Sequence, residues 1–229
     1  MAVPKAIFEN RHDAGRNLAT RLGEYAGQSV VVLAIPNGGV PVALEVAAIL
    51  KADLGLIISR KIPVPLNPER GFGAVADDGT LILNEALAKK IGLSPQQIER
   101  EADKVRADIK QRSLLYKGDR PLVRVSGRTV IVIDDGLASG FTMTAAVESV
   151  RHRQPKEVVV AVPVASMIAL NQLKNIADRV ITCATGTTRK FYIADFYRHW
   201  HDVSGDEVLR YLTHWRMRHL DEIKPPQGK

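Results

Sequence analysis

Cysteine is almost absent from this sequence of 229 residues, which contains only Cys183. A lone cysteine cannot form a disulfide within the chain, so disulfide-stabilised scaffolds and zinc sites built from cysteine pairs are excluded. Long hydrophobic runs are missing as well: no stretch approaches the roughly 18 uncharged apolar residues that a membrane helix needs, and residues 1–10 hold no apolar core typical of a signal peptide. We therefore expect a cytoplasmic protein with no membrane-spanning segment.

Positive charge is in modest excess. Lysine and arginine together number 32 against 25 for aspartate and glutamate, which gives a formal net charge of +7. A hydrophobic content of 45% and a charged content of 25% are those of an ordinary globular protein. The length allows one large domain or one domain with a sizeable insertion. The positive charge could serve nucleic acid, a small polyanionic ligand or neither, and composition leaves the three options open.

Short apolar runs alternate with segments of helical periodicity along the chain. The apolar runs contain few polar residues, a pattern typical of strands buried on both faces of a parallel sheet. We expect such strands at 30–35, 54–59, 129–133, 158–164 and 180–183. We expect helices at 11–25, at 41–50, after 142, at 166–177 and at 204–219. The alternation predicts an α/β fold with a central, mainly parallel sheet flanked by helices.

Two segments interrupt this alternation. Residues 62–79 carry several prolines and glycines, and the pair Asp78-Gly79 between two apolar triplets predicts a β-hairpin. We expect a long loop there that acts as a lid and leads into a β-ribbon. Residues 85–118 are charged and helix-prone, with a helix-capping box. We interpret them as a helical insertion within a single domain that covers the whole chain.

The most informative segment is 130–142, where four apolar residues lead into two adjacent carboxylates, Asp134 and Asp135. A turn of small residues follows and enters a helix, whose N-terminal backbone N–H groups can bind a phosphate group. The two acids beside it could accept hydrogen bonds from a diol. A sugar phosphate satisfies both halves of the segment, with its hydroxyls on the acids and its phosphate on the turn, which consists of Gly136, Leu137, Ala138, Ser139, Gly140, Phe141 and Thr142.

Two other interpretations of this segment are open. The aspartates could simply favour a helix N-terminus, although one acid would suffice for that. They could instead form a magnesium pocket of the receiver or dehalogenase type, which would leave the phosphate-like turn unexplained. Neither common nucleotide motif is present, because the chain lacks G-x-x-x-x-G-K-[ST] and no strand is followed by G-x-G-x-x-G.

Two further strand ends carry unusual residues. Asn37, Gly38 and Gly39 follow the first strand, and adjacent glycines would let backbone N–H groups turn toward an anion. Arg60 and Lys61 follow the second strand, and two cations at that place suit a pyrophosphate. Taken alone, each has a simpler interpretation: a plain strand-to-helix turn and a solvated basic strand end.

Residues 130–142 resemble the phosphoribosyl pyrophosphate (PRPP) signature of type I phosphoribosyltransferases, in which four apolar residues precede two acids and a turn that ends in Gly-x-Thr or Gly-x-Ser. Other segments are similar to a group of bacterial and archaeal phosphoribosyltransferases, known from prediction, that carry a helical insertion before this motif. They are 8–11, 14–15, 18–19, 36–43, 60–62, 67–69, 73–76 and 161–164. The resemblance covers most of the chain and is weaker at 191–200.

This resemblance implies a magnesium-dependent transfer of the phosphoribosyl group from PRPP to an acceptor, with release of pyrophosphate. It implies that Asp134 and Asp135 hold the ribose hydroxyls and that the turn at 136–142 holds the 5′-phosphate. It places the pyrophosphate on Asn37, Gly38, Gly39, Arg60 and Lys61. Mg²⁺ would be held mainly through PRPP, without a dedicated set of protein ligands.

The sequence does not identify the acceptor, which could be a nucleobase or another amine. Ala138 stands where the 6-oxopurine enzymes of the family carry an aspartate that works on the base, and this argues against hypoxanthine and guanine. We expect the C-terminal segment 184–229 to form the hood on the acceptor side. Glu69, Asp77 and Asp78 lie near the lid and could act on the acceptor, but the ordinary interpretation is that they are solvated hairpin carboxylates. Phe191, Tyr192 and Phe196 could stack on a base, but aromatic residues next to a sheet are more often part of the core.

Two alternative functions stay open at this point. One is a PRPP or nucleotide sensor with the same fold and no turnover, and the other is a ribose-phosphate hydrolase. Nucleic acid is a minor option, because the basic residues of 99–112 are interleaved with acidic ones. Proteins of this fold often pair, so a homodimer is one expected state.

Overall fold

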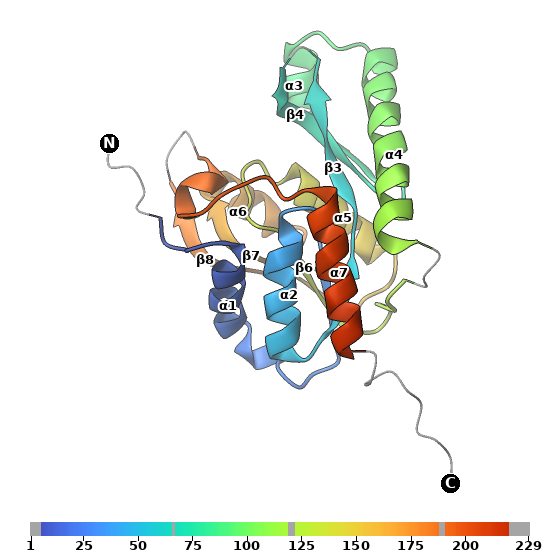
Figure 1. Cartoon of the computed structure of the whole chain (residues 1–229). Helices are drawn as coiled ribbons and strands as arrows, with labels where there is room; N and C mark the ends of the chain where they lie inside the picture. The colour runs from blue at the N-terminus through green and yellow to red at the C-terminus, as the bar shows by residue number, and fades with distance from the viewer. Residues whose placement is uncertain (1–5, 66, 119–121, 188–190, 220–229) are drawn as a thin grey trace.

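A computed structural model describes residues 6–65, 67–118, 122–187 and 191–219 (Figure 1). Its centre is a five-stranded parallel sheet in the order β2-β1-β6-β7-β8. The predicted α/β fold with a mainly parallel central sheet is confirmed. The strands are β1 (Val30–Ala34), β2 (Asp53–Leu56), β6 (Thr129–Ile133), β7 (Glu157–Ser166) and β8 (Arg179–Gly186).

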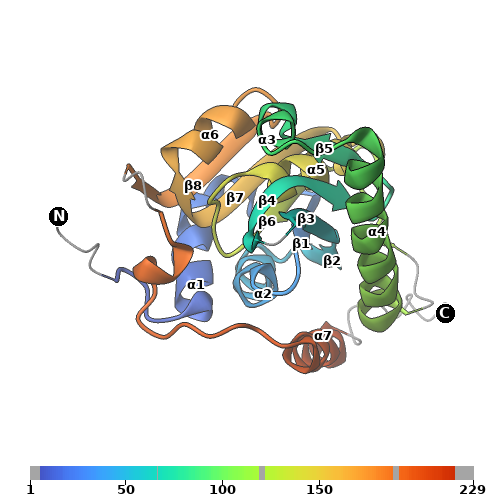
Figure 2. The ribbon, with the colours of Figure 1, turned by 90° about the horizontal axis from the view of Figure 1, so that it is seen from above.

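Helices cover both faces of this sheet because its central strands are apolar on both faces. They are α1 (Arg11–Arg21), α2 (Gly39–Leu50), α5 (Phe141–Arg151) and α6 (Met167–Leu173). Alternate residues of β1 point to opposite sides. Val32 and Ala34 pack in one core with α1 and α2, whereas Val31 and Leu33 pack in another with α5 and α6. The C-terminal helix α7 (Gly205–His219) packs outside α2, as Figure 2 shows.

A second, antiparallel sheet projects from the parallel one, with a long helix beside it (Figure 1). Its strands are β3 (Ser59–Val64), β4 (Asn67–Ala76) and β5 (Leu81–Leu83). The predicted strand 54–59 is therefore wrong in extent, because β2 ends at Leu56 and the chain enters the second sheet at Ser59. The connecting Ile57 and Ile58 are fully buried, so the apolar run reflects burial between two sheets rather than one strand.

The predicted loop at 62–79 is also wrong, because most of it belongs to β3 and β4. Pro63 lies where the register between these strands shifts, and there a missing N–H disrupts little of the ladder. The predicted hairpin is confirmed: Asp78 and Gly79 lie in the turn between β4 and β5. Proline and glycine therefore mark irregularities of a ribbon rather than a loop.

The segment 85–118 contains the helices α3 (Glu85–Lys90) and α4 (Pro95–Lys117). The predicted capping box is confirmed, since Ser94 Oγ accepts a hydrogen bond from the Gln97 amide and Gln97 Oε1 accepts one from the Ser94 amide. Ala102, Val105 and Ile109 of α4 are buried in the same core as α2. The single-domain organisation remains a prediction.

Several element ends differ from expectation. The first helix ends at Arg21 and is followed by a 3₁₀ turn, Gly23–Tyr25, while α6 ends at Leu173 rather than at 177. Strand β8 continues to Gly186 because it pairs with β7 as far as Ser166. Helix α7 matches its prediction. Residues 188–190 and 220–229 of the expected hood lie outside the described residues. None of the described helices has the length and apolar character to cross a bilayer.

Candidate functional site

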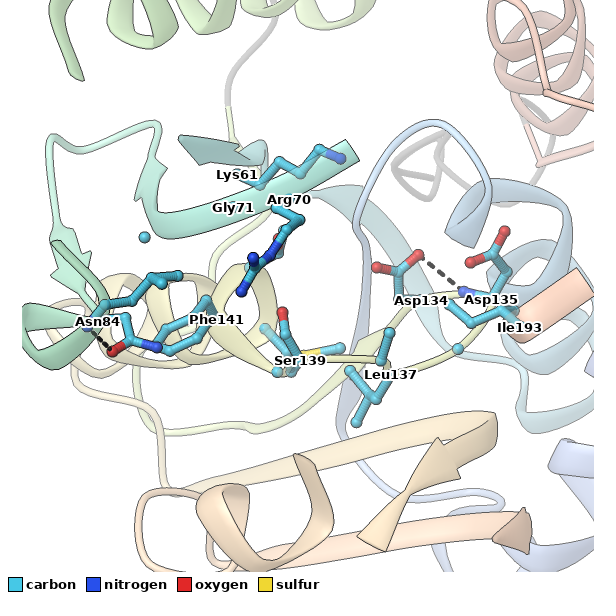
Figure 3. A pocket seen from close by; sticks show the side chains of 17 residues that line it. Lys61, Arg70, Gly71, Asn84, Asp134, Asp135, Leu137, Ser139, Phe141 and Ile193 are labelled. Atoms are coloured by element: carbon cyan, nitrogen blue, oxygen red, sulfur yellow. Dashed lines mark hydrogen bonds between the residues drawn. The ribbon is translucent and has the colours of Figure 1, made fainter. Parts of the chain in front are cut away.

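A cavity of about 470 Å³ lies at the carboxyl end of β6, where ligands of open α/β sheets bind (Figure 3). The whole predicted sugar-phosphate segment lines it, together with residues of the second sheet and the segment after it. In Figure 3, Asp134 and Asp135 lie at one end of the cavity and Asn84 and Phe141 at the other. The lining consists of Lys61, Arg70, Gly71, Gly73, Asn84, Leu87, residues 134–143 and Ile193.

The turn at 136–142 is tied down at one point and open at another. The Leu137 amide donates to the Val164 carbonyl at 2.9 Å, and the Leu137 carbonyl accepts from the Ser166 amide at 2.8 Å. Ala138 and Ser139 beyond it are exposed. Gly140 has a φ of 83° and directly precedes α5, so the first N–H groups of that helix point to the cavity. This is the arrangement that binds a phosphate group.

The aspartates do not cap this helix. Gly140 occupies the N-cap position of α5, and no side chain caps the helix there. The simple capping interpretation of Asp134 and Asp135 is therefore wrong. No group of three or more histidine, cysteine, aspartate or glutamate side chains within the described ranges could hold a metal ion, so the structure offers no support for a metal pocket of the receiver type.

Asp135 is buried and Asp134 is partly exposed, and the two acids have different partners. Asp134 Oδ1 accepts a hydrogen bond from the Asp135 amide at 2.8 Å, whereas Asp135 Oδ2 forms an ion pair with Arg11 Nε at 2.8 Å. Burial raises the pKa of Asp134 well above its ordinary range, and the adjacent Asp135 charge adds to this. Burial also raises the pKa of Asp135, but Arg11 opposes the shift. The negative charge of the pair is therefore favoured on Asp135.

Sequence reasoning missed Arg11 as a residue of this site, because the segment 8–11 contributed only to the family resemblance. The side chain is 6% exposed and comes from the first turn of α1. The sequence offered one signal, which is that Arg11 lies on the same face of the predicted helix as Ala14 and Leu18. Only the tertiary structure shows that the side chain is buried and which group it contacts.

The loop at 36–39 packs directly against the two acids. The peptide bond between Pro36 and Asn37 is cis. A Cβ atom at Gly38 would overlap the Asp135 carboxylate, and one at Gly39 would lie 2.7 Å from the Ile133 carbonyl oxygen. Glycine is therefore required at both positions by close approach. The predicted pyrophosphate loop and the predicted ribose acids lie side by side.

The Asn37 side chain joins three parts of the molecule at this loop. It donates to the Val203 carbonyl at 2.8 Å, and its oxygen accepts from the Tyr116 hydroxyl at 3.0 Å and from Arg112 at 3.2 Å. Tyr116 and Arg112 lie on α4. The segment interpreted as an insertion thus holds the loop in place, a contact that no sequence pattern indicated.

Arg60 and Lys61 do not act as the predicted pair at a strand end. Both lie within β3, and successive side chains of a strand point to opposite faces. Lys61 lines the cavity, as does Arg70 of β4 (Figure 3). Arg60 is not part of the cavity lining and pairs with Asp108 of α4 at 3.1 Å. Burial and the nearby Arg112 lower the pKa of Arg60.

The carboxylates near the hairpin are occupied by structural contacts. Asp77 pairs with Lys117 and, at 3.1 Å, with Arg153. Burial would raise the pKa of Asp78, but hydrogen bonds, first of all from Thr80, lower it to about 2. Both acids therefore hold the hairpin to neighbouring segments, and neither lines the cavity.

The C-terminal aromatics largely belong to the core. Phe191 and Phe196 contact each other with ring centroids 5.3 Å apart, and Phe196 is buried. Tyr192 is exposed, and Ile193 is the described residue of this segment that lines the cavity. The aromatic residue in the described cavity lining is Phe141 of α5, so the C-terminal aromatics do not supply it.

Comparison with known proteins agrees with this geometry. Residues 74–196 match the phosphoribosyl transferase domain family. Two Mycobacterium tuberculosis proteins, of strains CDC 1551 and H37Rv, are provisionally named phosphoribosyl transferases and are each 36% identical over 206 residues. The match covers 90% of this chain and 46% of each relative, so the chain spans about half the length of the curated relatives it matches.

A solved structure shares the whole fold. The crystal structure of TT1426 from Thermus thermophilus is 36% identical in sequence, with a TM-score of 0.74 over 91% of this chain and 98% of that one. The sequence match, the domain match and the parallel sheet with its acid pair and phosphate-type turn lead to one conclusion. The chain belongs to the phosphoribosyl transferase domain family.

Proposed function

We propose that this protein transfers the phosphoribosyl group of PRPP to an acceptor and releases pyrophosphate. The observation that carries the proposal is the cavity at the end of β6. It brings two adjacent acids, Asp134 and Asp135, together with a phosphate-type turn and two cations, Lys61 and Arg70. This combination suits a sugar with an anionic group at each end.

The ribose and its 5′-phosphate are assigned first. The carboxylates of Asp134 and Asp135 accept hydrogen bonds from the ribose hydroxyls. The first N–H groups of α5 and the Ser139 and Thr142 hydroxyls bind the 5′-phosphate. Arg70 lies across the cavity from this turn (Figure 3) and offsets the phosphate charge.

The leaving pyrophosphate is assigned to the loop at Asn37, Gly38 and Gly39, with Lys61 above Asp134 (Figure 3). Bound Mg²⁺ would supply charge neutralisation of the leaving group. The donor set fits an ion carried by the substrate, because the described acids of the site are two neighbouring carboxylates rather than a cluster of three. The chain's own cations and amides stabilise the developing negative charge.

The second sheet would exclude water from the reacting centre. Lys61, Arg70 and Gly71 line the cavity from β3 and β4, opposite the turn that follows β6. Exclusion of water matters because an oxocarbenium-like sugar would otherwise be captured by it. We propose that the ribbon performs the covering role for which the sequence predicted a loop. The acceptor is a nucleobase or another amine, and Ala138 in place of an aspartate argues against a 6-oxopurine.

A screen of nucleobases and other amines tests this function. Purified protein is incubated with PRPP, Mg²⁺ and each candidate acceptor, and pyrophosphate release is measured. We expect release with at least one acceptor, and loss of release when both acids are changed in Asp134→Asn/Asp135→Asn. Asp103→Asn, an exposed residue of α4 that pairs with Arg106, is the matched control and should retain full activity.

The same assay separates the two alternatives. PRPP consumption without acceptor would indicate a hydrolase. Saturable PRPP binding with no turnover across a broad acceptor panel would indicate a sensor. Full activity of the double acid variant would contradict the proposed site.

A further inference from the structure

Residues 197–203, which we call the C-terminal strap, connect the 3₁₀ turn η2 (Ile193–Phe196) to α7 and are bonded to the N-terminal segment. The amides of Arg198 and His199 donate to the carbonyls of Phe8 at 2.8 Å and Glu9 at 2.9 Å. Two segments nearly 190 residues apart in sequence are thus held together, and α1 begins directly after one of them.

The strap also contacts three different parts of the candidate site. The Tyr197 hydroxyl donates to the Asp135 carbonyl at 2.6 Å. The His201 carbonyl accepts from Arg11 at 2.8 Å, and the Val203 carbonyl accepts from the Asn37 side chain at 2.8 Å. The strap therefore touches the ribose acids and the pyrophosphate loop, although the sequence placed this segment only on the acceptor side.

Arg11 is the common partner in this arrangement. Its Nε donates to Asp135 Oδ2, its Nη1 donates to the His201 carbonyl, and its guanidinium lies 3.8 Å from the centre of the Trp200 ring. A guanidinium that is 6% exposed has lost most of its hydration and depends on these contacts. Its planar group can serve a carboxylate, a carbonyl and an aromatic face at once, which an ammonium cannot.

This contact fixes the rotation of the Asp135 carboxylate. One oxygen is held by Arg11, and the backbone of Gly38 lies so close to the same oxygen that a Cβ atom there would overlap it. A carboxylate held on two sides presents its remaining lone pairs in one direction. Asp134, by contrast, is held by a backbone amide.

We propose that Arg11 is a positioning residue for PRPP: it orients the Asp135 carboxylate for the ribose hydroxyls and makes the C-terminal strap part of the sugar-binding site. For its substrate the inference rests on the proposed function. Arg11 does not line the cavity, so it acts through Asp135 rather than on the substrate.

Binding of PRPP with Mg²⁺, measured by titration calorimetry on the full chain, tests the proposal in four proteins: wild type, Arg11→Gln, Asp135→Asn and the double variant. We expect Arg11→Gln to weaken binding by about tenfold, roughly 1.4 kcal/mol. We expect the double variant to bind within about twofold of the weaker single variant, because both changes remove one interaction. Arg16→Gln on the same helix is the matched control, since its side chain is largely exposed, and should bind within about twofold of wild type.

A second measurement needs no ligand. Amide hydrogen exchange at Arg198 and His199 reports whether the strap is held, and we expect it to accelerate by about tenfold in Arg11→Gln but not in Arg16→Gln. If Arg11→Gln does not fold, Tyr197→Phe replaces it in both measurements. That variant removes only the hydroxyl that donates to the Asp135 backbone carbonyl, so it tests whether the strap supports Asp135, and it should weaken PRPP binding about threefold.

The outcomes separate this inference from the proposed function. If folded wild-type protein does not bind PRPP, the proposed function fails, and unchanged strap exchange in Arg11→Gln overturns the role of Arg11 independently. If wild type binds PRPP, a dissociation constant for Arg11→Gln within twofold of wild type overturns the inference. Additive effects of Arg11→Gln and Asp135→Asn do so as well, because they would show that the two residues act separately.

Discussion

Gly38→Ala probes the closest approach in the site. The backbone at Gly38 has φ −61° and ψ −32°, values that alanine adopts freely, so the substitution introduces no backbone strain. The added Cβ would overlap the Asp135 carboxylate and lie 2.6 Å from its Cγ atom. Asp135 cannot simply rotate away, because it is buried and paired with Arg11 at 2.8 Å.

The expected magnitude follows from these contacts. Relief of the overlap requires Asp135 to move off Arg11, and breaking a buried ion pair costs about 3–5 kcal/mol when one partner is lost. Partial movement of both groups reduces this toward the range of about 1–3 kcal/mol that is typical of overpacking. Reduced entropy of the unfolded chain offsets about 0.5 kcal/mol. We expect Gly38→Ala to lower the free energy of unfolding by about 2 kcal/mol and to weaken PRPP binding.

Urea unfolding followed by circular dichroism measures the first effect, and calorimetric titration with PRPP and Mg²⁺ measures the second. Gly23→Ala is the matched control, because a Cβ there meets nothing within 4 Å. It should stay within about 0.5 kcal/mol of wild type. A Gly38→Ala protein as stable as Gly23→Ala, with PRPP binding unchanged, would refute the claim that close approach at Gly38 shapes the site.

Three further predictions concern carboxylates. Burial and the neighbouring acid raise the pKa of Asp134 above its ordinary 3.8, so ionisation of this group is penalised in the folded state. Asp134→Asn should therefore raise the free energy of unfolding by about 1 kcal/mol at neutral pH, and the gain should shrink toward pH 4 in urea titrations. Calorimetry with the same variant should show that PRPP binding is lost. Hydrogen bonds hold the pKa of Asp78 at about 2 although burial opposes them. Asp78 therefore contributes at most about 1 kcal/mol to the free energy of unfolding at this partly exposed site, and the contribution is present above pH 4 and is lost as the pH falls toward 2. A difference in urea midpoint between wild type and Asp78→Asn that stays constant from pH 4 to pH 2 would contradict this prediction. Asp108→Asn removes the carboxylate that Arg60 and Arg112 share beside the loop at 36–39. Because both arginines then lose their anionic partner, magnesium pyrophosphate should bind about threefold more tightly in calorimetry. Weaker binding would count against a role for these arginines.

The acid pair carries a stability cost. Burial raises the pKa of both Asp134 and Asp135, and a single arginine contacts one of the two carboxylates. Under the proposed function, this cost belongs to a site that binds the ribose hydroxyls.

Local patterns determined much of the fold. Apolar runs predicted the parallel strands because a strand buried on both faces leaves no room for polar side chains. The capping box at Ser94 predicted a helix start because only neighbouring residues take part in it. The acids and the turn of the PRPP motif were readable for the same reason, since both lie in one continuous segment.

The second sheet was not predicted from the sequence because proline and glycine occur both in loops and at irregularities within strands. At 62–79 they indicated a loop, but the pairing of β3 with β4 depends on contacts across strands that no single window contains. The pair Arg60 and Lys61 was misread for a related reason. Once the segment is a strand, its period of two sends the side chains to opposite faces, so Lys61 reaches the cavity and Arg60 reaches α4.

The sequence by itself determined that this chain is an α/β protein of the phosphoribosyltransferase family, that its one cysteine cannot form a disulfide within the chain, and that residues 130–142 resemble the PRPP signature. Only the tertiary structure decided what holds that motif in place. Arg11 and the strap at 197–203 lie nearly two hundred residues apart in the sequence. Asn37 contacts Tyr116 of α4, which is also distant in the sequence and which no local pattern indicated. Contacts of this kind arise from packing of distant segments, and local propensity and spacing do not encode them.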